Sequence, residues 1–283
     1  MRRTVATLST IPILALACEA PAPGGGADRA EAATDTVSVL TLNIWHNQQD
    51  WPARLEVIVP GVAARDPDVI CLQEVLQNPE LPNQAETLAE RLGYRAYFAS
   101  WDSAGSAKRY GNAILTRDPV MDSGSRTLDP PDDYRVVAHV RVDPGPGPVD
   151  VYCTHLHHTQ ERPETRRAQI EGALAFIDET RGSGPVVLAG DFNARVGAPE
   201  LEALQGRFTD TFGALVPDAD TVTTLNTAKG HTPRRIDHVF VAPGEESTLV
   251  PVSARRILDE PVDSVWGTDH FGVMVWFERT GGP

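Results

Sequence analysis

Short runs of apolar and β-branched residues alternate along the chain with stretches that have helical spacing or loop composition. The runs that predict strands are Thr36–Trp45, Asp68–Val75, Asn112–Arg117, Tyr134–Val142, Val149–His155, Pro185–Gly190, Ile236–Val241 and Phe271–Phe277. Two of them, Asp68–Val75 and Pro185–Gly190, are almost continuously apolar, as is usual for strands buried on both faces. Alternation of this kind over one core of roughly 240 residues predicts a single α/β domain.

Three stretches have the apolar spacing of helices. They are Arg54–Arg65, Gln84–Leu92 and Arg162–Thr180. Pro163 suits the first turn of the last helix, and Gly93 suits the position that ends the second. Pro60 lies inside the first stretch, and we expect it to kink or end that helix, because proline has no backbone N–H to donate.

The N-terminal residues have the pattern of a targeting segment. Arg2 and Arg3 precede a mostly apolar run, Val5–Ala17, which is too short to span a membrane comfortably. Small residues then lead into Cys18, as in a bacterial lipoprotein signal, although a plain secretory signal remains the alternative. We therefore expect a signal peptide over residues 1–17, a flexible tether over 18–35 and one domain over 36–279, in a chain that is exported as a cell-envelope lipoprotein or secreted.

Charge and cysteine content narrow the functional classes only a little. The net charge is −14, and the mature chain would lose two positive charges and reach −16. Such an acidic chain mildly disfavours a processive nucleic-acid binder, but a bound metal ion would supply positive charge where it is needed. The cysteines have no zinc-like spacing, and we interpret Cys71 and Cys153 as buried thiols, although export would also allow a disulfide between them.

Polar residues gather where the apolar runs end. These residues are Asn43, Glu74, His155, Asp191, Asn193, Asp237, Asp269 and His270. Strand ends at one edge of a sheet share a rim, so we expect these groups to converge. Their oxygen atoms suit Mg²⁺, with Mn²⁺ or Ca²⁺ as alternatives, and their histidines can move protons. This combination predicts hydrolysis of a phosphate ester, whose charge spreads over oxygens in the transition state.

Seven motifs in order make the chain resemble the endonuclease/exonuclease/phosphatase superfamily. The motifs are TLNIW, DVICLQE, YGNAILTR, VYCTHL, VVLAGDFN, RRIDHVFV and GTDHFGV. The resemblance implies a four-layer α/β sandwich, in which two mostly antiparallel sheets pack face to face with helices outside. The strand pattern alone also allows a doubly wound sheet, so this architecture follows from the resemblance.

The resemblance also implies roles for the strand-end residues. Asn43, Glu74 and Asp269 correspond to metal ligands, and Asp191 to a group that orients or deprotonates the attacking water or binds a second metal. Asn193 corresponds to an amide that holds the phosphate. His270 corresponds to the catalytic histidine and Asp237 to the carboxylate that orients it. His155 matches the second histidine of the nuclease-like and phosphatase-like branches. Arg135 stands where some members contact phosphate, although a solvated strand-edge arginine is as good an interpretation.

Other polar and aromatic residues have weaker patterns. His46 and His231 are within reach of the rim, whereas the expected strand geometry turns His238 to the opposite face. We interpret His157 and His158 as loop histidines and Asn112 as a structural residue. Core packing explains most of the aromatic residues around Tyr94–Trp101, but the loop at Trp101 is a candidate contact for a base or a lipid.

We therefore expect a Mg²⁺-dependent phosphodiesterase that acts on a nucleic acid or a phospholipid. A phosphomonoesterase of the inositol phosphatase type, or a catalytically inactive binding lipoprotein, is the alternative. A zinc amidohydrolase or protease is disfavoured because no HExxH motif is present. The expected partners are the phosphate ester and, through Cys18, a membrane, and we expect a monomer.

Overall fold

The computed structural model describes residues 36–145 and 147–281. The expected signal peptide and tether lie outside these residues. Within the described part of the chain, no helix combines the length and the apolar character that crossing a membrane requires.

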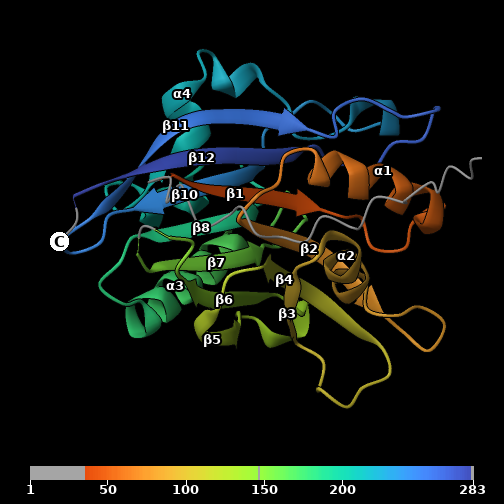
Figure 1. Cartoon of the computed structure of the whole chain (residues 1–283), viewed down its shortest axis with the longest axis horizontal. Helices are drawn as coiled ribbons and strands as arrows, with labels where there is room; N and C mark the ends of the chain where they lie inside the picture. The colour runs from red at the N-terminus through yellow and green to blue at the C-terminus, as the bar shows by residue number, and fades with distance from the viewer. Residues whose placement is uncertain (1–35, 146, 282–283) are drawn as a thin grey trace, which may run out of the picture. The chain divides into compact units, whose positions relative to one another are not determined.

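Two six-stranded sheets form the centre of the domain (Figure 1). The first has the strand order β11 (Thr248–Ile257), β12 (Gly272–Thr280), β1 (Thr36–Asn43), β2 (Val69–Gln77), β4 (Arg109–Thr116) and β3 (Arg95–Ser100). The second has the order β5 (Val120–Thr127), β6 (Val136–Val142), β7 (Val149–His155), β8 (Val186–Asp191), β10 (Asp237–Ala242) and β9 (Thr209–Asp210). In each sheet the two central strands are parallel, β1 with β2 and β7 with β8, and all other pairs are antiparallel.

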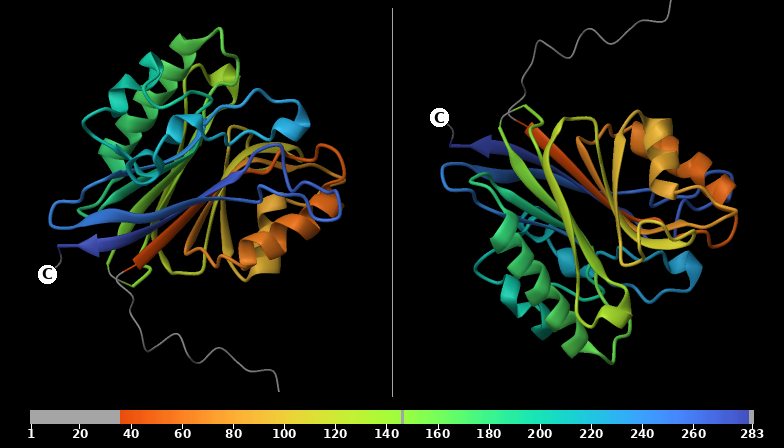
Figure 2. Two further views of the ribbon diagram at one scale, coloured as in Figure 1. Left: turned by 90° about the horizontal axis from the view of Figure 1, so that it is seen from above. Right: turned by 90° about the horizontal axis from the view of Figure 1, so that it is seen from below.

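Helices cover the outer faces of the two sheets, which gives the four layers that the resemblance implied (Figure 2). The α-helices are α1 (Trp51–Ala63), α2 (Gln84–Leu92), α3 (Pro163–Thr180) and α4 (Thr211–Leu215). Four short 3₁₀ helices, η1 (Pro131–Asp133), η2 (Pro199–Leu204), η3 (Ala219–Thr221) and η4 (Thr227–Lys229), lie in the connections. Helices α1 and α2 pack on the first sheet, and α3 packs on the second. The doubly wound alternative is therefore excluded.

Alternate side chains of each central strand enter different layers of the core. Val37 and Val39 of β1 join the cluster between the two sheets, whereas Leu40 and Leu42 join the cluster beneath α1 and α2. Because successive side chains of a strand point to opposite faces, a strand covered on both faces is apolar throughout. Cys71 and Cys153 lie in the cluster between the sheets as buried free thiols, as expected, and burial raises the pKa of Cys71 well above its usual value.

The strands that the hydrophobic pattern missed are β3, β5, β9 and β11, which are the four edge strands. An edge strand has one neighbour and is covered incompletely, so it need not be apolar; β5, for example, is exposed along most of its length. Strand β6 begins at Val136, so Tyr134 and Arg135 precede it rather than belonging to it. Helix α1 continues for three residues beyond Pro60, so of the two expected effects, a kink or an end, this proline does not end the helix.

The topology places one end of six strands at a common edge. The parallel strands β1, β2, β7 and β8 all finish there, and the antiparallel strands β10 and β12 begin there. The register makes the alignment close, because Asp191 is the direct partner of His155 on one side and of Asp237 on the other. The polar residues that follow or precede these strands are therefore brought together.

Candidate active site

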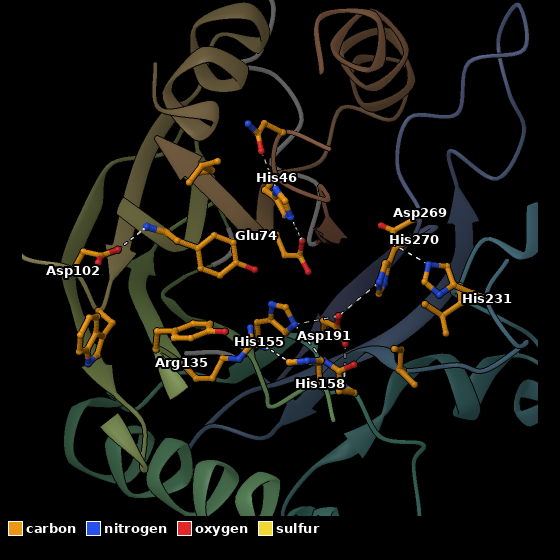
Figure 3. Close-up of a pocket in the computed structure, with 18 of the residues that line it drawn as sticks. His46, Glu74, Asp102, Arg135, His155, His158, Asp191, His231, Asp269 and His270 are labelled. Atoms are coloured by element: carbon orange, nitrogen blue, oxygen red, sulfur yellow. Dashed lines mark hydrogen bonds and ion pairs between the residues drawn. The ribbon is translucent and has the colours of Figure 1, made fainter. Parts of the chain in front are cut away.

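A cleft of about 820 Å³ lies over this edge and is lined by residues of both sheets (Figure 3). All of the predicted site residues except Asn43 and Asp237 line the cleft, and those two contact residues that do. The residues that reach the cleft wall from the predicted set are Glu74, Arg135, His155, Asp191, Asn193, Asp269 and His270. The structure thus gathers the predicted groups into one place.

Asp191 is the centre of the hydrogen-bond network in the cleft. Its Oδ2 accepts from Nδ2 of Asn43 at 3.1 Å, and its Oδ1 accepts from the backbone N–H of Asn193 at 2.9 Å. The same Oδ2 lies 3.5 Å from Nε2 of His155 and 3.9 Å from Nε2 of His270. Groups from β1, β7, β8 and the segment before β12 therefore meet at one carboxylate.

The environment of Asp191 disfavours its negative charge. Burial raises its pKa to about 7, and repulsion from Asp237 contributes to the rise, although His270, Asn193 and Asn43 oppose it. A buried carboxylate that lies beside a second one is stabilised by any cation that reaches it. The electrostatics of the cleft therefore favour the binding of positive charge close to Asp191.

His270 and Asp237 form the pair that the resemblance implied. Nδ1 of His270 lies 3.1 Å and 3.0 Å from the two carboxylate oxygens of Asp237, and both side chains are buried. Burial alone would lower the pKa of His270, but Asp237, Asp191 and Asp269 together hold it well above the usual value. The imidazole is thus charged, and its Nε2 faces Asp191.

A β-bulge directs Glu74 into the cleft. The register of β2 against β4 shifts between Leu72 and Val75, and Glu74 has a positive φ of 60°. Bulges of this kind change the direction of a side chain and are common next to active sites. Oε1 of Glu74 accepts from Nδ2 of Asn43 at 3.1 Å, and Oε2 lies 3.9 Å from Nε2 of His46.

Asp269 lies to the right of Glu74 in Figure 3, beside His231. Its Oδ2 is 3.0 Å from Nε2 of His231, and its Oδ1 is 3.3 Å from Oγ1 of Thr268. His46 and His231, which the sequence placed only within reach of the rim, thus each lie beside one of the carboxylates expected to bind metal.

The donor chemistry of the cleft fits a hard divalent cation. Within the described chain, Glu74 and Asp269 have histidines but no arginine or lysine within ion-pair distance. Asp191, Asp237 and His270 form a second group of potential ligands, with ligand atoms within 4.8 Å of one another. His270 and Asp237 are already bonded to each other, so we favour Glu74, Asp269, Asn43 and Asp191 as the ligands, the set that the resemblance implied. Asn43 would have to turn its amide, because its Oδ1 now accepts from the N–H of Trp45.

His155 and Asn193 form the floor of the cleft near Asp191. Nδ2 of Asn193 donates to Nε2 of His155 and to the carbonyl of Leu156, each at 3.1 Å. Burial lowers the pKa of His155 well below its usual value, and the charges of Arg135 and His270 lower it further, so this imidazole is neutral. Its Nδ1 has no hydrogen-bond partner among the described residues.

Arg135 is a buried cleft residue rather than a solvated strand-edge arginine. One of its Nη atoms lies 3.4 Å from Nδ1 of His158, and its Nε lies 3.9 Å from Asp133. That Nε has no hydrogen-bond partner among the described residues. A buried guanidinium with free donor capacity suits an anionic oxygen.

Arg54 is an important residue that the sequence analysis missed. Its guanidinium is buried and donates to five carbonyls, those of Ile44, Trp45, His46, Gln48 and Gly267. Burial lowers its pKa to about 10, while Asp269 and Glu74 oppose the shift. Arg54 thus ties the loop after β1 to the segment that carries Asp269. Its position inside an amphipathic helix gave no signal of this role.

Of the remaining histidines, His238 points away from the cleft, as expected. Its Nε2 donates to the carbonyl of Ala194 at 2.9 Å, and its Nδ1 accepts from Arg235 at 3.1 Å. Burial lowers the pKa of His238 to about 4, and the charge of Arg235 adds to the effect. His157 is buried against Asp133, and Asn112 donates to the carbonyl of Val136, so both support the structure.

The neutral His238 predicts a loss of stability in mild acid. The unfolded chain binds a proton below the usual histidine pKa of 6.5, whereas the folded chain does so only near pH 4, so stability falls as the pH falls through this window. At pH 5 this one group should cost about 2 kcal/mol of the free energy of unfolding. Urea unfolding at pH 7 and pH 5 measures the loss, which should be smaller in His238→Gln. An equal loss in both proteins would contradict the assignment.

Comparison with known proteins identifies the family of the chain. A sequence model of the Endonuclease/Exonuclease/phosphatase family matches residues 40–270. Protein angel of Drosophila melanogaster is 25% identical over 192 residues, 63% of this chain and 54% of its own. Tyrosyl-DNA phosphodiesterase 2 of Mus musculus is 24% identical over 254 residues, 85% of this chain and 66% of its own. This chain therefore spans less than two-thirds of either relative.

A solved structure shows the same fold. TDP2 from D. rerio, complexed with a single strand DNA product, superposes with a TM-score of 0.70 at 19% identity, covering 86% of this chain and 98% of the other. The match of the family model extends from β1 to His270 and so includes every residue of the predicted site. The chain therefore belongs to the Endonuclease/Exonuclease/phosphatase family.

Proposed function

We propose that the protein is a Mg²⁺-dependent phosphodiesterase that hydrolyses its substrate with an activated water. The observation that carries the proposal is the convergence on Asp191, whose buried carboxylate meets Asn43, Asn193, His155 and His270. Burial and the neighbouring Asp237 raise the pKa of Asp191 to about 7, and a cation beside this carboxylate would stabilise its charge. A divalent cation held by Glu74, Asp269, Asn43 and Asp191 would supply positive charge there and polarise the phosphate.

The side chains of this protein then have distinct tasks. Arg135 binds the phosphate oxygens, and Asn193 would join it by releasing one of the hydrogen bonds that its amide nitrogen donates to His155 and Leu156. Asp191 accepts a hydrogen bond from the attacking water, which orients the water and offers its proton an acceptor. The imidazolium of His270, oriented by Asp237, stabilises the charge that develops on the phosphate.

A phosphodiester is a better candidate than a monoester. The mouse relative is by name a phosphodiesterase that acts on tyrosyl-DNA, and the similar D. rerio structure holds a single strand DNA product. A monoesterase of the inositol phosphatase type remains the alternative.

A substrate screen of the full chain tests the proposal. It compares single-stranded and duplex DNA, RNA, sphingomyelin, phosphoinositides and inositol phosphates, each with Mg²⁺, with Mn²⁺ and with EDTA. We expect hydrolysis of a diester that EDTA abolishes and Mg²⁺ restores. Cleavage of monoesters alone, or cleavage that survives EDTA, would count against it.

We also propose that the protein is a monomer held at the cell envelope by a lipid on Cys18. The lipid anchor rests on the sequence pattern around Cys18, which lies outside the described part of the chain. Labelling with a palmitate analogue should require Cys18, and Cys18→Ala should release the protein from the membrane fraction. If the wild type and Cys18→Ala are equally absent from the membrane fraction, the protein is secreted without a lipid anchor.

A further inference from the structure

One wall of the cleft carries two exposed aromatic side chains. Trp101 is 48% exposed and Tyr134 is 46% exposed, and both line the cleft. The other large hydrophobic residues of the described chain with comparable exposure lie outside the cleft and are aliphatic; they are Met121, Val250, Val252 and Val262. Figure 3 shows their chain neighbours Asp102 and Arg135 on the side of the cleft away from Asp269 and His270.

The backbone around Trp101 is fixed by hydrogen bonds. The N–H of Asp102 donates to Oγ of Ser100 at 3.0 Å, and this Oγ donates to the carbonyl of Tyr110 at 2.8 Å. The N–H of Tyr110 in turn donates to Oδ2 of Asp102 at 2.8 Å. Both neighbours of Trp101 are thus tied to one another and to β4, so the indole is presented to solvent from a rigid base.

Tyr134 is held in place at an energetic cost. Its φ is +48°, a conformation that bulky residues rarely adopt, and yet its ring remains exposed instead of filling the core. The guanidinium carbon of Arg135 lies 5.6 Å from the centre of the ring, and the ring of Tyr110 meets it edge-on at 6.2 Å. Strained backbone conformations of this kind cluster at active sites and ligand clamps, and Tyr134 combines one with an exposed ring that lines the cleft.

The charges on this wall indicate what kind of ligand would contact the rings of Trp101 and Tyr134. The chain has a net charge of −14, but Lys108 and Arg135 both line this side of the cleft. Aromatic faces beside cations suit successive bases and phosphates of a nucleic acid. A lipid chain is a poorer fit, because Asp102 and Lys108 interrupt the apolar surface that it would need.

We propose that Trp101 and Tyr134 form a stacking subsite for an unpaired nucleobase next to the scissile phosphate, with Lys108 contacting a flanking phosphate. The substrate class is then single-stranded nucleic acid or an unpaired end, since the bases of an intact duplex hide their faces. This inference rests on the proposed phosphodiesterase activity, which it makes more specific.

The experiment uses two matched oligomers and the full chain. One is oligothymidylate, and the other has the same backbone with abasic tetrahydrofuran residues in place of every nucleoside. Wild type should prefer oligothymidylate, and Trp101→Ala or Tyr134→Ala should lower the ratio of the two kcat/KM values by roughly 5- to 150-fold, mainly through KM. Trp101→Phe should keep most of the preference, because a phenyl ring still stacks.

Met121→Ala is the control, because Met121 is 60% exposed, hydrophobic and remote from the cleft. It should change neither kcat/KM value. Binding of both oligomers to the inactive His270→Ala protein, followed by fluorescence anisotropy, gives a readout that does not need turnover. There the added Trp101→Ala change should weaken the binding of oligothymidylate only.

The outcomes separate the subsite from the activity. Hydrolysis of both oligomers with a ratio that Trp101→Ala and Tyr134→Ala leave unchanged would overturn the subsite and keep the phosphodiesterase. Base-dependent binding through Trp101, with no hydrolysis of any diester, would support the subsite and overturn the activity. Trp101-dependent binding to sphingomyelin vesicles in place of oligothymidylate would overturn the nucleobase assignment.

Discussion

His270→Ala should lower kcat by at least about 10²-fold and up to about 10⁴-fold, the range that general acid–base groups contribute. The charged imidazole lies between Asp237 and Asp191, so its loss removes positive charge from the point where the phosphate oxygens gain negative charge. KM should change less than kcat, because the group acts mainly in the transition state. Steady-state kinetics on the best diester measure both, with thermal unfolding as the check that the variant is folded.

The partner variant shows whether the two residues act as one unit. Asp237→Asn leaves the imidazole in place but removes the charge that orients it and keeps it protonated, so its loss in kcat should be smaller. Adding Asp237→Asn to His270→Ala should then cost little more. Losses that multiply independently in a double-mutant cycle would refute the pairing, and near-normal turnover of His270→Ala would refute its catalytic role.

Glu74→Gln should weaken Mg²⁺ binding by at least roughly 10- to 100-fold, the loss seen when a residue that only supports a ligand is removed. The substitution keeps the shape of the side chain and removes one negative charge from the cleft. Turnover at a fixed, limiting Mg²⁺ concentration should fall and should recover in part when more Mg²⁺ is added.

Glu80→Gln is the matched control, because Glu80 is an exposed glutamate of the same segment that does not line the cleft. Isothermal titration calorimetry should give the wild-type affinity for Glu80→Gln and a clearly weaker one for Glu74→Gln. Equal affinities in the two variants would show that Glu74 is not a ligand. Asp191 and Asp237 would then be the better candidates for holding the cation.

The interior of the sandwich was predictable from the hydrophobic pattern, whereas its edges were not. The eight strands with two neighbours each carry an apolar run, because both of their faces are covered. The edge strands β5 and β11 carry polar residues and a proline, since hydrogen bonds to one neighbour hold them without a covered surface. The two-sheet architecture came from the resemblance, because strand and helix order alone does not say which strands pair.

The sequence predicted which residues at strand ends form the site, but not the hydrogen bonds that hold them in place. Asp191, Asp237 and His270 carried a signal because each lies at the end of an apolar run. Arg54 carried none, because its task is to bind carbonyls of two loops that are distant in sequence. The positive φ values of Glu74 and Tyr134 were hidden in the same way, since the sequence does not show where a bulge or a strained turn forms.

Metal dependence is the most direct test of the central claim that the Asp191 cleft is a divalent-metal phosphodiesterase centre. The measurement is the initial rate at which the full chain, freed of metal with EDTA, hydrolyses a phosphodiester before and after Mg²⁺ is added. We expect no hydrolysis without metal and a saturable rise in rate with Mg²⁺ in the wild type. The Glu74→Gln variant should need a higher Mg²⁺ concentration to reach half of its maximal rate. Equal rates with and without Mg²⁺ would contradict the claim.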